Sequence, residues 1–266
     1  MESVLNKLKD TKIIVGFVVL CVLIYVVYKW YKKESGQPFL IKQHRRGDYT
    51  IKNSGGNITK INPYMHFPNK VLPITPYGNG YSYSFWLSID NWEYNYNKPK
   101  HIFSKGDRAG VSVNPGVWLY PKENNLMIRV DTFDRMKGKG PVTMSPYGKN
   151  VEFKPEAKCD LVKIPLQRWN HIIIVLNNKT LDVYLNGKLT RSCTYNEPPI
   201  FNQNPIHVTD NGGFGGQLGE LRYFNRAIEP DEVYSIYSSG NKTFNLYSMF
   251  SKIKNTIHMP QQSCVK

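Results

Sequence analysis

Alanine, the residue with the strongest intrinsic preference for helix, is nearly missing from this sequence. It occurs only at positions 109, 157 and 227, whereas the chain of 266 residues holds 18 Tyr, 17 Pro and 20 Gly. Tyrosine favours strands, and proline and glycine spread along a chain indicate many turns. The composition therefore argues against a mainly helical protein and predicts an all-β protein without a long disordered linker.

Long apolar runs are also scarce, and the longest is the uncharged stretch of residues 13–28, between Lys12 and Lys29. At about 1.5 Å per residue this run is short for a bilayer core of roughly 30 Å, but the aromatic pair Trp30–Tyr31 extends it into an interfacial belt. A signal peptide needs an Ala-x-Ala-like cleavage site, and none follows the run. We therefore expect residues 1–33 to be an uncleaved single-pass membrane anchor. Three lysines on each flank leave its orientation open.

Acidic residues are outnumbered, since 20 Asp and Glu face 35 Lys and Arg and give a net charge of +15. A surface of this charge favours an anionic partner, such as lipid headgroups, nucleic acid, or an acidic protein or glycan. The alternative is a solvated basic face without a dedicated ligand. No run of Lys and Arg exceeds two residues and no nucleic-acid-binding motif occurs, so nucleic acid is the weaker expectation.

The part after the anchor begins irregularly and becomes regular from Tyr81. Residues 34–80 contain several prolines and are interpreted as a stalk that leads into the first strands. Residues 81–89 alternate aromatic or apolar residues with serine, which predicts a strand inside a sandwich. A three-strand meander is expected over 169–193, with a four-residue turn at 177–180 and the pair Asn186–Gly187 favouring a two-residue type I′ turn.

Two helical segments are expected near the C-terminus. Acidic residues in the first turn of 229–237 complement the helix dipole, and Gly240 ends this short helix. The tail over 241–266 has helical spacing of aromatic residues and packs on the domain or lies at a membrane surface.

The central part of the chain resembles a laminin-G-like, concanavalin A-like jelly roll. The resemblance covers about 81–240 and implies two curved antiparallel sheets packed face to face, here preceded by one transmembrane helix. Function does not follow from it, because this architecture hosts lectins, adhesion modules, glycosidases and structural proteins. The residues that carry the resemblance are Phe85–Trp86, Ile102–Lys105, Trp169–His171, Leu181–Lys188 and Gly219–Ile228.

Two cysteines add a narrower likeness. With Cys159 before Pro165 and Cys193 after the meander turn, the domain is similar to domains encoded by large nucleocytoplasmic DNA viruses. That resemblance implies a Cys159–Cys193 disulfide and a place in a virion, at its internal membrane or as a minor capsid-associated protein. The bond requires the strand before Pro165 to pair near the third strand of the meander, and two buried free thiols are the alternative.

No catalytic carboxylates stand out. Retaining glycosidases need two carboxylates about 5 Å apart, and the hydrolases of the superfamily that the chain resembles carry a Glu-x-Asp-x-x-Glu strand, which is missing from the sequence. Asp131 and Asp134, and the acids within 229–232, lie in turn or helix-start contexts. We therefore expect no catalytic residues and no enzymatic activity.

Metal-binding patterns are weak as well. Asp107 and Asp210 lie in glycine-rich loops, where laminin-G-like sandwiches commonly bind calcium, but neither has an acidic cluster beside it. Turn capping is the favoured role for both residues. The six histidines show no metal-ligand spacing, and His171 is expected on a strand beside the core. We therefore expect no cofactor, with calcium as the alternative.

One segment is suited to ligand binding. Trp92, Tyr94 and Tyr96 follow the Trp86 strand at a spacing of two, and such a rim can stack on sugar rings or on a partner protein. The alternative is an edge strand, or a loop packed on its own domain.

The leading functional hypothesis is a non-enzymatic, membrane-anchored interaction or structural module that holds a protein or glycan partner. The rival is a glycan-active enzyme of the concanavalin A-like superfamily with a displaced site. The two differ in whether a polysaccharide is bound without turnover or is cleaved.

Overall fold

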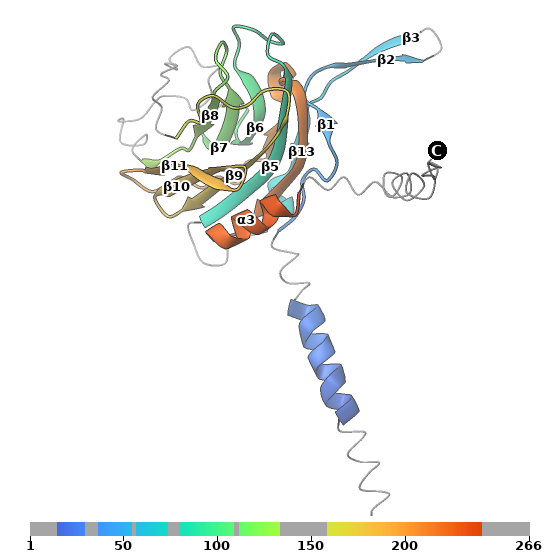
Figure 1. Ribbon diagram of the computed structural model, residues 1–266, viewed down its shortest axis with the longest axis vertical. Helices are drawn as coiled ribbons and strands as arrows, with labels where there is room; N and C mark the ends of the chain where they lie inside the picture. Colours follow the sequence, from blue (N-terminus) through green and yellow to red (C-terminus); the bar gives the residue numbers. More distant parts are fainter. Residues whose placement is uncertain are drawn as a thin grey trace, which may run out of the picture.

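The computed structural model describes residues 15–29, 37–54, 57–73, 80–108, 112–133 and 159–240. Two antiparallel sheets lie face to face, and a two-stranded hairpin projects from one end of them (Figure 1). The all-β sandwich expected from the sequence is confirmed.

The larger sheet has six strands in the order β1-β13-β5-β9-β10-β11, all antiparallel to their neighbours. Its members come from both ends of the domain, so the last strand, β13, lies between the short first strand, β1, and the long strand β5. The strands are β1 (Arg45–Arg46), β5 (Gly80–Asn91), β9 (Trp169–Asn177), β10 (Thr180–Leu185), β11 (Lys188–Thr194) and β13 (Gly215–Phe224).

The second sheet has five strands in the order β4-β12-β6-β7-β8. A separate hairpin of β2 (Thr50–Ser54) and β3 (Asn57–Ile61) follows β1. The strands of the second sheet are β4 (Met65–Phe67), β6 (Lys100–Gly106), β7 (Val113–Leu119), β8 (Leu126–Arg129) and β12 (Ile206–Val208); the 3-10 turns are η1 (Asn69–Val71) and η2 (Asp210–Gly212).

Strand β5 contributes five side chains to the main core cluster. Its alternate residues from Tyr81 to Ile89 point between the sheets and are at most 4% exposed, whereas the serines between them lie on the outer face. Tyr83 and Phe85 each place their rings 5.3 Å from that of Phe103 in the opposite sheet. The alternation seen in the sequence is therefore the division between the core and the outer face of the sheet.

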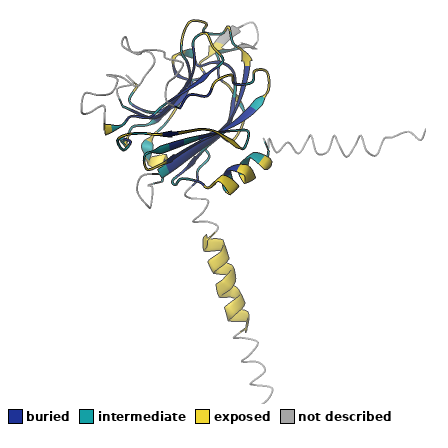
Figure 2. Ribbon diagram, turned by 60° about the vertical axis from the view of Figure 1, so that its left-hand side comes forward, coloured by how far each residue is buried: buried dark blue, intermediate teal, exposed yellow. Residues whose placement is uncertain are grey.

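The outer face of the six-stranded sheet is partly covered by helix α3 (Pro230–Ser238). Pro230 occupies the first turn, where its missing N–H costs nothing, and Asp231 and Glu232 complement the positive end of the helix dipole. Val233 packs with Ile173 and other residues of the sheet in a second apolar cluster, while the side of α3 away from the sheet is exposed (Figure 2).

The meander forms as expected, with one difference. Asn186 and Gly187 both have positive φ, at 51° and 77°, as a type I′ turn requires. The preceding turn contains only two residues, Asn178 and Lys179, because Asn177 and Thr180 pair with each other and extend both strands. The four-residue turn expected at 177–180 is therefore wrong by one residue on each side.

The segment interpreted as a stalk contributes strands to both sheets. Within residues 37–73, β1 pairs with β13 in the larger sheet and β4 pairs with β12 in the smaller one. The described part of the 34–80 segment therefore contributes β1 and β4 to the sandwich and the β2–β3 hairpin beside it.

Residues 15–29 form a helix in which every residue is exposed, as Figure 2 shows. Within the described ranges, no helix combines the length and the apolar character needed to cross a membrane. The anchor over residues 1–33 stays a prediction, and the tail over 241–266 lies outside the described residues.

A disulfide joins Cys159 to Cys193, the pair that the viral resemblance implied. Cys193 lies on β11 opposite Leu181 of β10, and Cys159 precedes β9. The loop that the bond closes therefore contains β9, β10 and most of β11.

We predict that replacing both cysteines by alanine lowers the free energy of unfolding by roughly 3–4 kcal/mol, because the bond closes a loop across a sequence separation of 34 residues. Urea unfolding monitored by tryptophan fluorescence measures the change. Wild-type protein treated with a reductant should match the double variant. A double variant that unfolds at the same urea concentration as the oxidised wild type would contradict the prediction.

Candidate functional site

Three segments meet at one end of the sandwich and form what we call the rim. They are the loop over 92–98 after β5, the segment Gly47–Tyr49 between β1 and β2, and the loop Asp210–Phe214 before β13. Gly213 is required there because its φ is 64° and a Cβ atom would collide with the carbonyl oxygen of Gly47. The rim therefore brings together three parts of the chain that are far apart in sequence.

The three aromatic residues considered for a binding surface lie in the rim, on the turn that follows β5. Asn95 and Asn97 have positive φ, at 54° and 63°, which interrupts the period of two. Trp92 and Tyr94 are half-buried, and Tyr96 is 52% exposed. Tyr96 is thus the member of the trio whose ring is most open to a partner.

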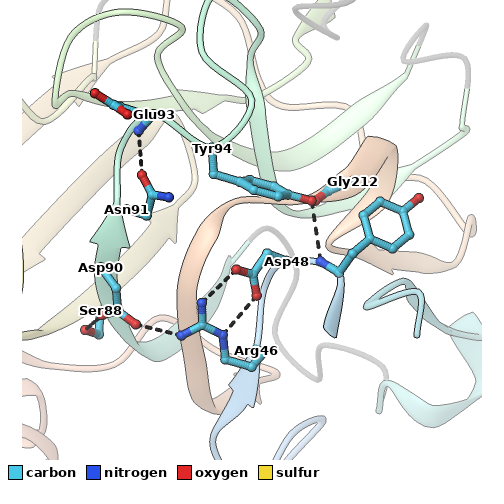
Figure 3. Close-up of polar contacts among 9 residues, drawn as sticks. Arg46, Asp48, Ser88, Asp90, Asn91, Glu93, Tyr94 and Gly212 are labelled. Carbon is cyan, nitrogen blue, oxygen red and sulfur yellow. Dashed lines mark hydrogen bonds and ion pairs between the residues drawn. The ribbon is translucent and has the colours of Figure 1, made fainter. Parts of the chain in front are cut away.

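Tyr94 holds the rim segments together (Figure 3). Its hydroxyl donates to the carbonyl oxygen of Gly212 at 2.8 Å and accepts the backbone N–H of Tyr49 at 3.4 Å. The neighbouring Asn95 side chain donates to the carbonyl oxygen of Gly213 at 3.2 Å. Burial raises the pKa of Tyr94, so the hydroxyl stays protonated and keeps its donor role at neutral pH.

Trp92 is fixed from two directions. Its indole N–H donates to the carbonyl oxygen of Lys122 at 3.3 Å, and the ammonium of Lys100 lies 4.6 Å from the centre of its ring. Lys100 also donates to the carbonyl oxygens of Tyr120, at 3.3 Å, and Pro121, at 3.0 Å. Burial lowers the pKa of Lys100 to about 8, and these partners offset part of the cost of burying the charge.

Arg46 connects two carboxylates beside the rim (Figure 3). Its guanidinium donates to both oxygens of Asp48, at 2.9 and 2.7 Å, and to Asp90 at 2.8 Å. The Ser88 hydroxyl donates to the other oxygen of Asp90 at 2.8 Å. The hydrogen bond to Asp48 is the main cause that raises the pKa of Arg46, so one guanidinium joins the two acids in a cluster of charge-assisted hydrogen bonds.

The acids considered for catalysis have structural positions. Glu232 accepts two hydrogen bonds from Arg226, at 2.8 and 2.7 Å, at the start of α3, and Asp131 is buried. Asp134 lies outside the described residues. Glu232 and the pair Asp48 and Asp90 each accept hydrogen bonds from an arginine, which is a structural role for all three.

The two aspartates considered for calcium are also engaged. Asp107 accepts the backbone N–H of Ser112 at 2.9 Å, the turn-capping role. Asp210 accepts two hydrogen bonds from Arg108, at 2.9 and 2.8 Å. No group of three or more His, Cys, Asp or Glu suited to a metal occurs in the part of the chain that the structure describes.

Two buried histidines serve the fold. His101 accepts the backbone N–H of Asp210 at 2.9 Å, and burial lowers its pKa to about 3. His171 lies on β9 beside the core, as expected, with its Nε2 2.9 Å from the Ser84 hydroxyl. Burial lowers the pKa of His171 to about 4, so both rings are neutral at physiological pH.

Sequence reasoning missed Arg46 and Tyr49. The available signal was the Arg45–Arg46 pair followed two residues later by Asp48, which is typical of a local ion pair. The partner Asp90 lies 44 residues away, and only the sheet topology brings it to Arg46.

A model of the Concanavalin A-like lectin/glucanases superfamily matches residues 59–234. Among curated proteins, the BEACH domain-containing protein lvsE of Dictyostelium discoideum is 25% identical over 199 residues, which are 68% of this chain. The chain spans only 7% of the length of that protein.

Solved structures share the architecture at low identity. The binding domain of botulinum neurotoxin DC, solved with rat synaptotagmin II, is 12% identical with a TM-score of 0.48, covering 77% of this chain and 51% of that one. Domain 4 of the arabinanase AbnA from Geobacillus stearothermophilus, solved with arabinotriose, is 20% identical with a TM-score of 0.43, covering 75% and 88%. With TM-scores below 0.5, neither similarity bears on function.

We predict that Arg46→Gln destabilises the domain by about 1 kcal/mol, because it leaves Asp48 and Asp90 close together without their shared cation on a partly exposed surface. Arg45→Gln is the matched control, since Arg45 is the exposed neighbour on β1 and forms no ion pair with a described residue. Thermal unfolding at low and high salt measures both variants. Equal midpoints for the two variants at low salt would show that the cluster contributes nothing.

Proposed function

Because the chain belongs to the Concanavalin A-like lectin/glucanases superfamily, we propose that it is a non-enzymatic, membrane-anchored module that binds a protein or glycan partner at its rim. The observation that carries the proposal is that the apolar helix over 15–29 is exposed along its whole length, whereas the sandwich has a closed core and an ordered rim.

The helix over 15–29 supports the membrane part of the proposal. Its apolar side chains are all more than half exposed, for example Phe17 at 66%, Leu23 at 56% and Ile24 at 59%. Burying one such side chain is worth about 1.5–3 kcal/mol, so a helix of this composition requires an apolar environment. A bilayer supplies it, and Lys12 and Lys29 at the ends of the uncharged run would reach the headgroups.

The path of the chain supports a partner on the side away from the anchor. Residues 37–40 enter the sandwich against Leu221–Tyr223 near the end of β13. The rim lies at the other end of β13, before Gly215. Seven residues separate Gly215 from Arg222, which is about 23 Å along a strand. The rim is therefore at the end of the domain opposite to the point where the anchor joins it.

The ion pairs of the rim support binding over catalysis. Asp48 and Asp90 both form ion pairs with Arg46, so each carboxylate is already engaged within the domain. A glycan-active enzyme is the alternative function, and the superfamily admits it.

The viral resemblance adds a location to the proposal, in or beside the internal membrane of a virion. The Cys159–Cys193 disulfide supports an oxidising compartment or a virus with its own thiol-oxidising route. Mass spectrometry of purified particles tests this location, and absence of the chain from particles that contain other membrane proteins would reject it.

We predict that alkaline carbonate leaves the full chain in the membrane pellet, because the uncharged run over 13–28 lies in the bilayer. A chain that begins at residue 34 should appear in the supernatant. Immunoblotting of both fractions measures the result. Recovery of the full chain in the supernatant would reject the anchor.

We predict that the rim binds a glycan from a polysaccharide panel saturably and without release of reducing ends. Tyr96→Ser should weaken binding about tenfold, the loss expected for one aromatic contact. Tyr234→Ser is the matched control, because Tyr234 on α3 is also exposed, at 62%. Sustained release of reducing ends would support the enzyme instead.

If no glycan binds, a photo-crosslinking amino acid at position 96 tests for a protein partner in the native membrane. A crosslinked protein that is absent when the probe stands at position 234 supports the rim. A failure of both the glycan panel and the crosslinking would reject it.

A further inference from the structure

A second surface lies beside the rim, where two loops are joined. Ile164 donates its backbone N–H to the carbonyl oxygen of Asn124 at 2.8 Å, and the Asn124 side chain donates to the carbonyl oxygen of Ile164 at 3.1 Å. The backbone N–H of Lys163 donates to the Asn125 side chain at 2.9 Å. The loops over 121–125 and 162–168 therefore form one rigid unit.

This unit is tied to the same end of the sandwich as the rim. The backbone N–H of Gln167 donates to the carbonyl oxygen of Ile89 near the end of β5 at 2.8 Å. Trp92 of the rim donates to the carbonyl oxygen of Lys122 at 3.3 Å. The two loops are thus held at the end of the domain that lies farthest from residue 37.

The unit exposes aliphatic side chains among basic ones. Val162 is 54% exposed and Leu166 is 39% exposed, while Ile164 between them is buried and holds the loop down. Lys122, Lys163 and Arg168 are exposed around them. We call these five exposed residues the loop patch.

The backbone presents these side chains at a conformational cost. Lys163 and Gln167 have φ of 56° and 57°, in the left-handed region that side chains of this size rarely adopt. These two residues bracket Ile164, which is buried, and Leu166, which is exposed. Strained backbone that the surroundings enforce is concentrated at functional sites.

We propose that the loop patch binds the surface of an anionic lipid bilayer other than the one that holds the anchor. The proposal rests on the anchored topology described above, since it makes the protein a bridge between two membranes.

The chemistry of the loop patch favours lipid over a glycan or a protein. Val162 and Leu166 offer no hydrogen-bonding group to a sugar, but aliphatic tips surrounded by Lys and Arg suit the boundary between headgroups and acyl chains. The two loops hold three basic residues, Lys122, Lys163 and Arg168, against one acid, Glu123, which leaves an excess of positive charge. Each basic residue strengthens binding to an anionic bilayer about fivefold.

The test is vesicle capture with the full chain. The protein is reconstituted through its anchor into phosphatidylcholine vesicles, and fluorescent acceptor vesicles are added, made of phosphatidylcholine with or without phosphatidylserine. We expect capture of the phosphatidylserine acceptors, loss of capture as salt rises, and little capture of neutral acceptors. Equal capture of both acceptors, or capture of neither, would overturn the proposal.

Two pairs of variants locate the contact. Val162→Ser with Leu166→Ser should reduce capture about tenfold. Leu189→Ser is the control and should not reduce capture, because Leu189 is as exposed as Val162, at 54%, but lies on β11. Lys122→Gln with Lys163→Gln should also reduce capture, whereas Lys188→Gln should not. The lysine pair keeps the test decisive if the serine variant does not fold, which its thermal midpoint reports.

The failure of this proposal is distinguishable from failure of the proposed function. If the chain floats with the donor vesicles and resists carbonate but captures no acceptors, the anchor stands and the lipid contact is wrong. If the loop-patch variants and their controls capture acceptors equally, another surface binds the lipid, and the loop patch is again rejected.

Discussion

The position of β5 at the centre of the larger sheet is the constraint on which both the core and the rim depend. The strand pairs with β13 on one side and β9 on the other. A slip of one residue in either register would exchange its buried aromatic face for its serine face. Packing against the second sheet therefore fixes the register of β5. The register in turn determines that the strand ends at Asn91 and that the rim loop begins there.

The parts of the fold that the sequence predicted are those whose signal is local. The alternation in β5, the Asn186–Gly187 turn and the acidic first turn of α3 each lie within about ten residues of sequence, and each was confirmed. The contacts of the rim could not be predicted from the sequence, because they join distant residues such as Tyr94 and Gly212, which are 118 positions apart. The spacing of two among aromatic residues left an edge strand and a loop both open, and Asn95 and Asn97, which tolerate the left-handed conformation, turn the chain into a loop.

The rim gains its order from charges and hydroxyls bound to backbone carbonyl groups. The ammonium of Lys100 is held by two carbonyl oxygens and the Trp92 ring, and Tyr94 spans two other segments. A loop held in this way loses little conformational entropy when a partner binds. This preorganisation suits a recognition surface better than a lid that must move during catalysis.

The proposed arrangement also requires a firm connection between the anchor and the sandwich, and Arg222 provides one. Its guanidinium donates to the backbone and side-chain oxygens of Gln37, at 3.1 and 3.0 Å, and lies 4.6 Å from the centre of the Phe39 ring. In the proposed arrangement, a mechanical force between a partner at the rim and an anchor in the membrane would be applied to the domain at this point and transmitted along β13. Because β13 pairs with β5 from Gly215 to Phe224 and with β1 at Gln217 and Leu218, the load is shared among many backbone bonds that must break together.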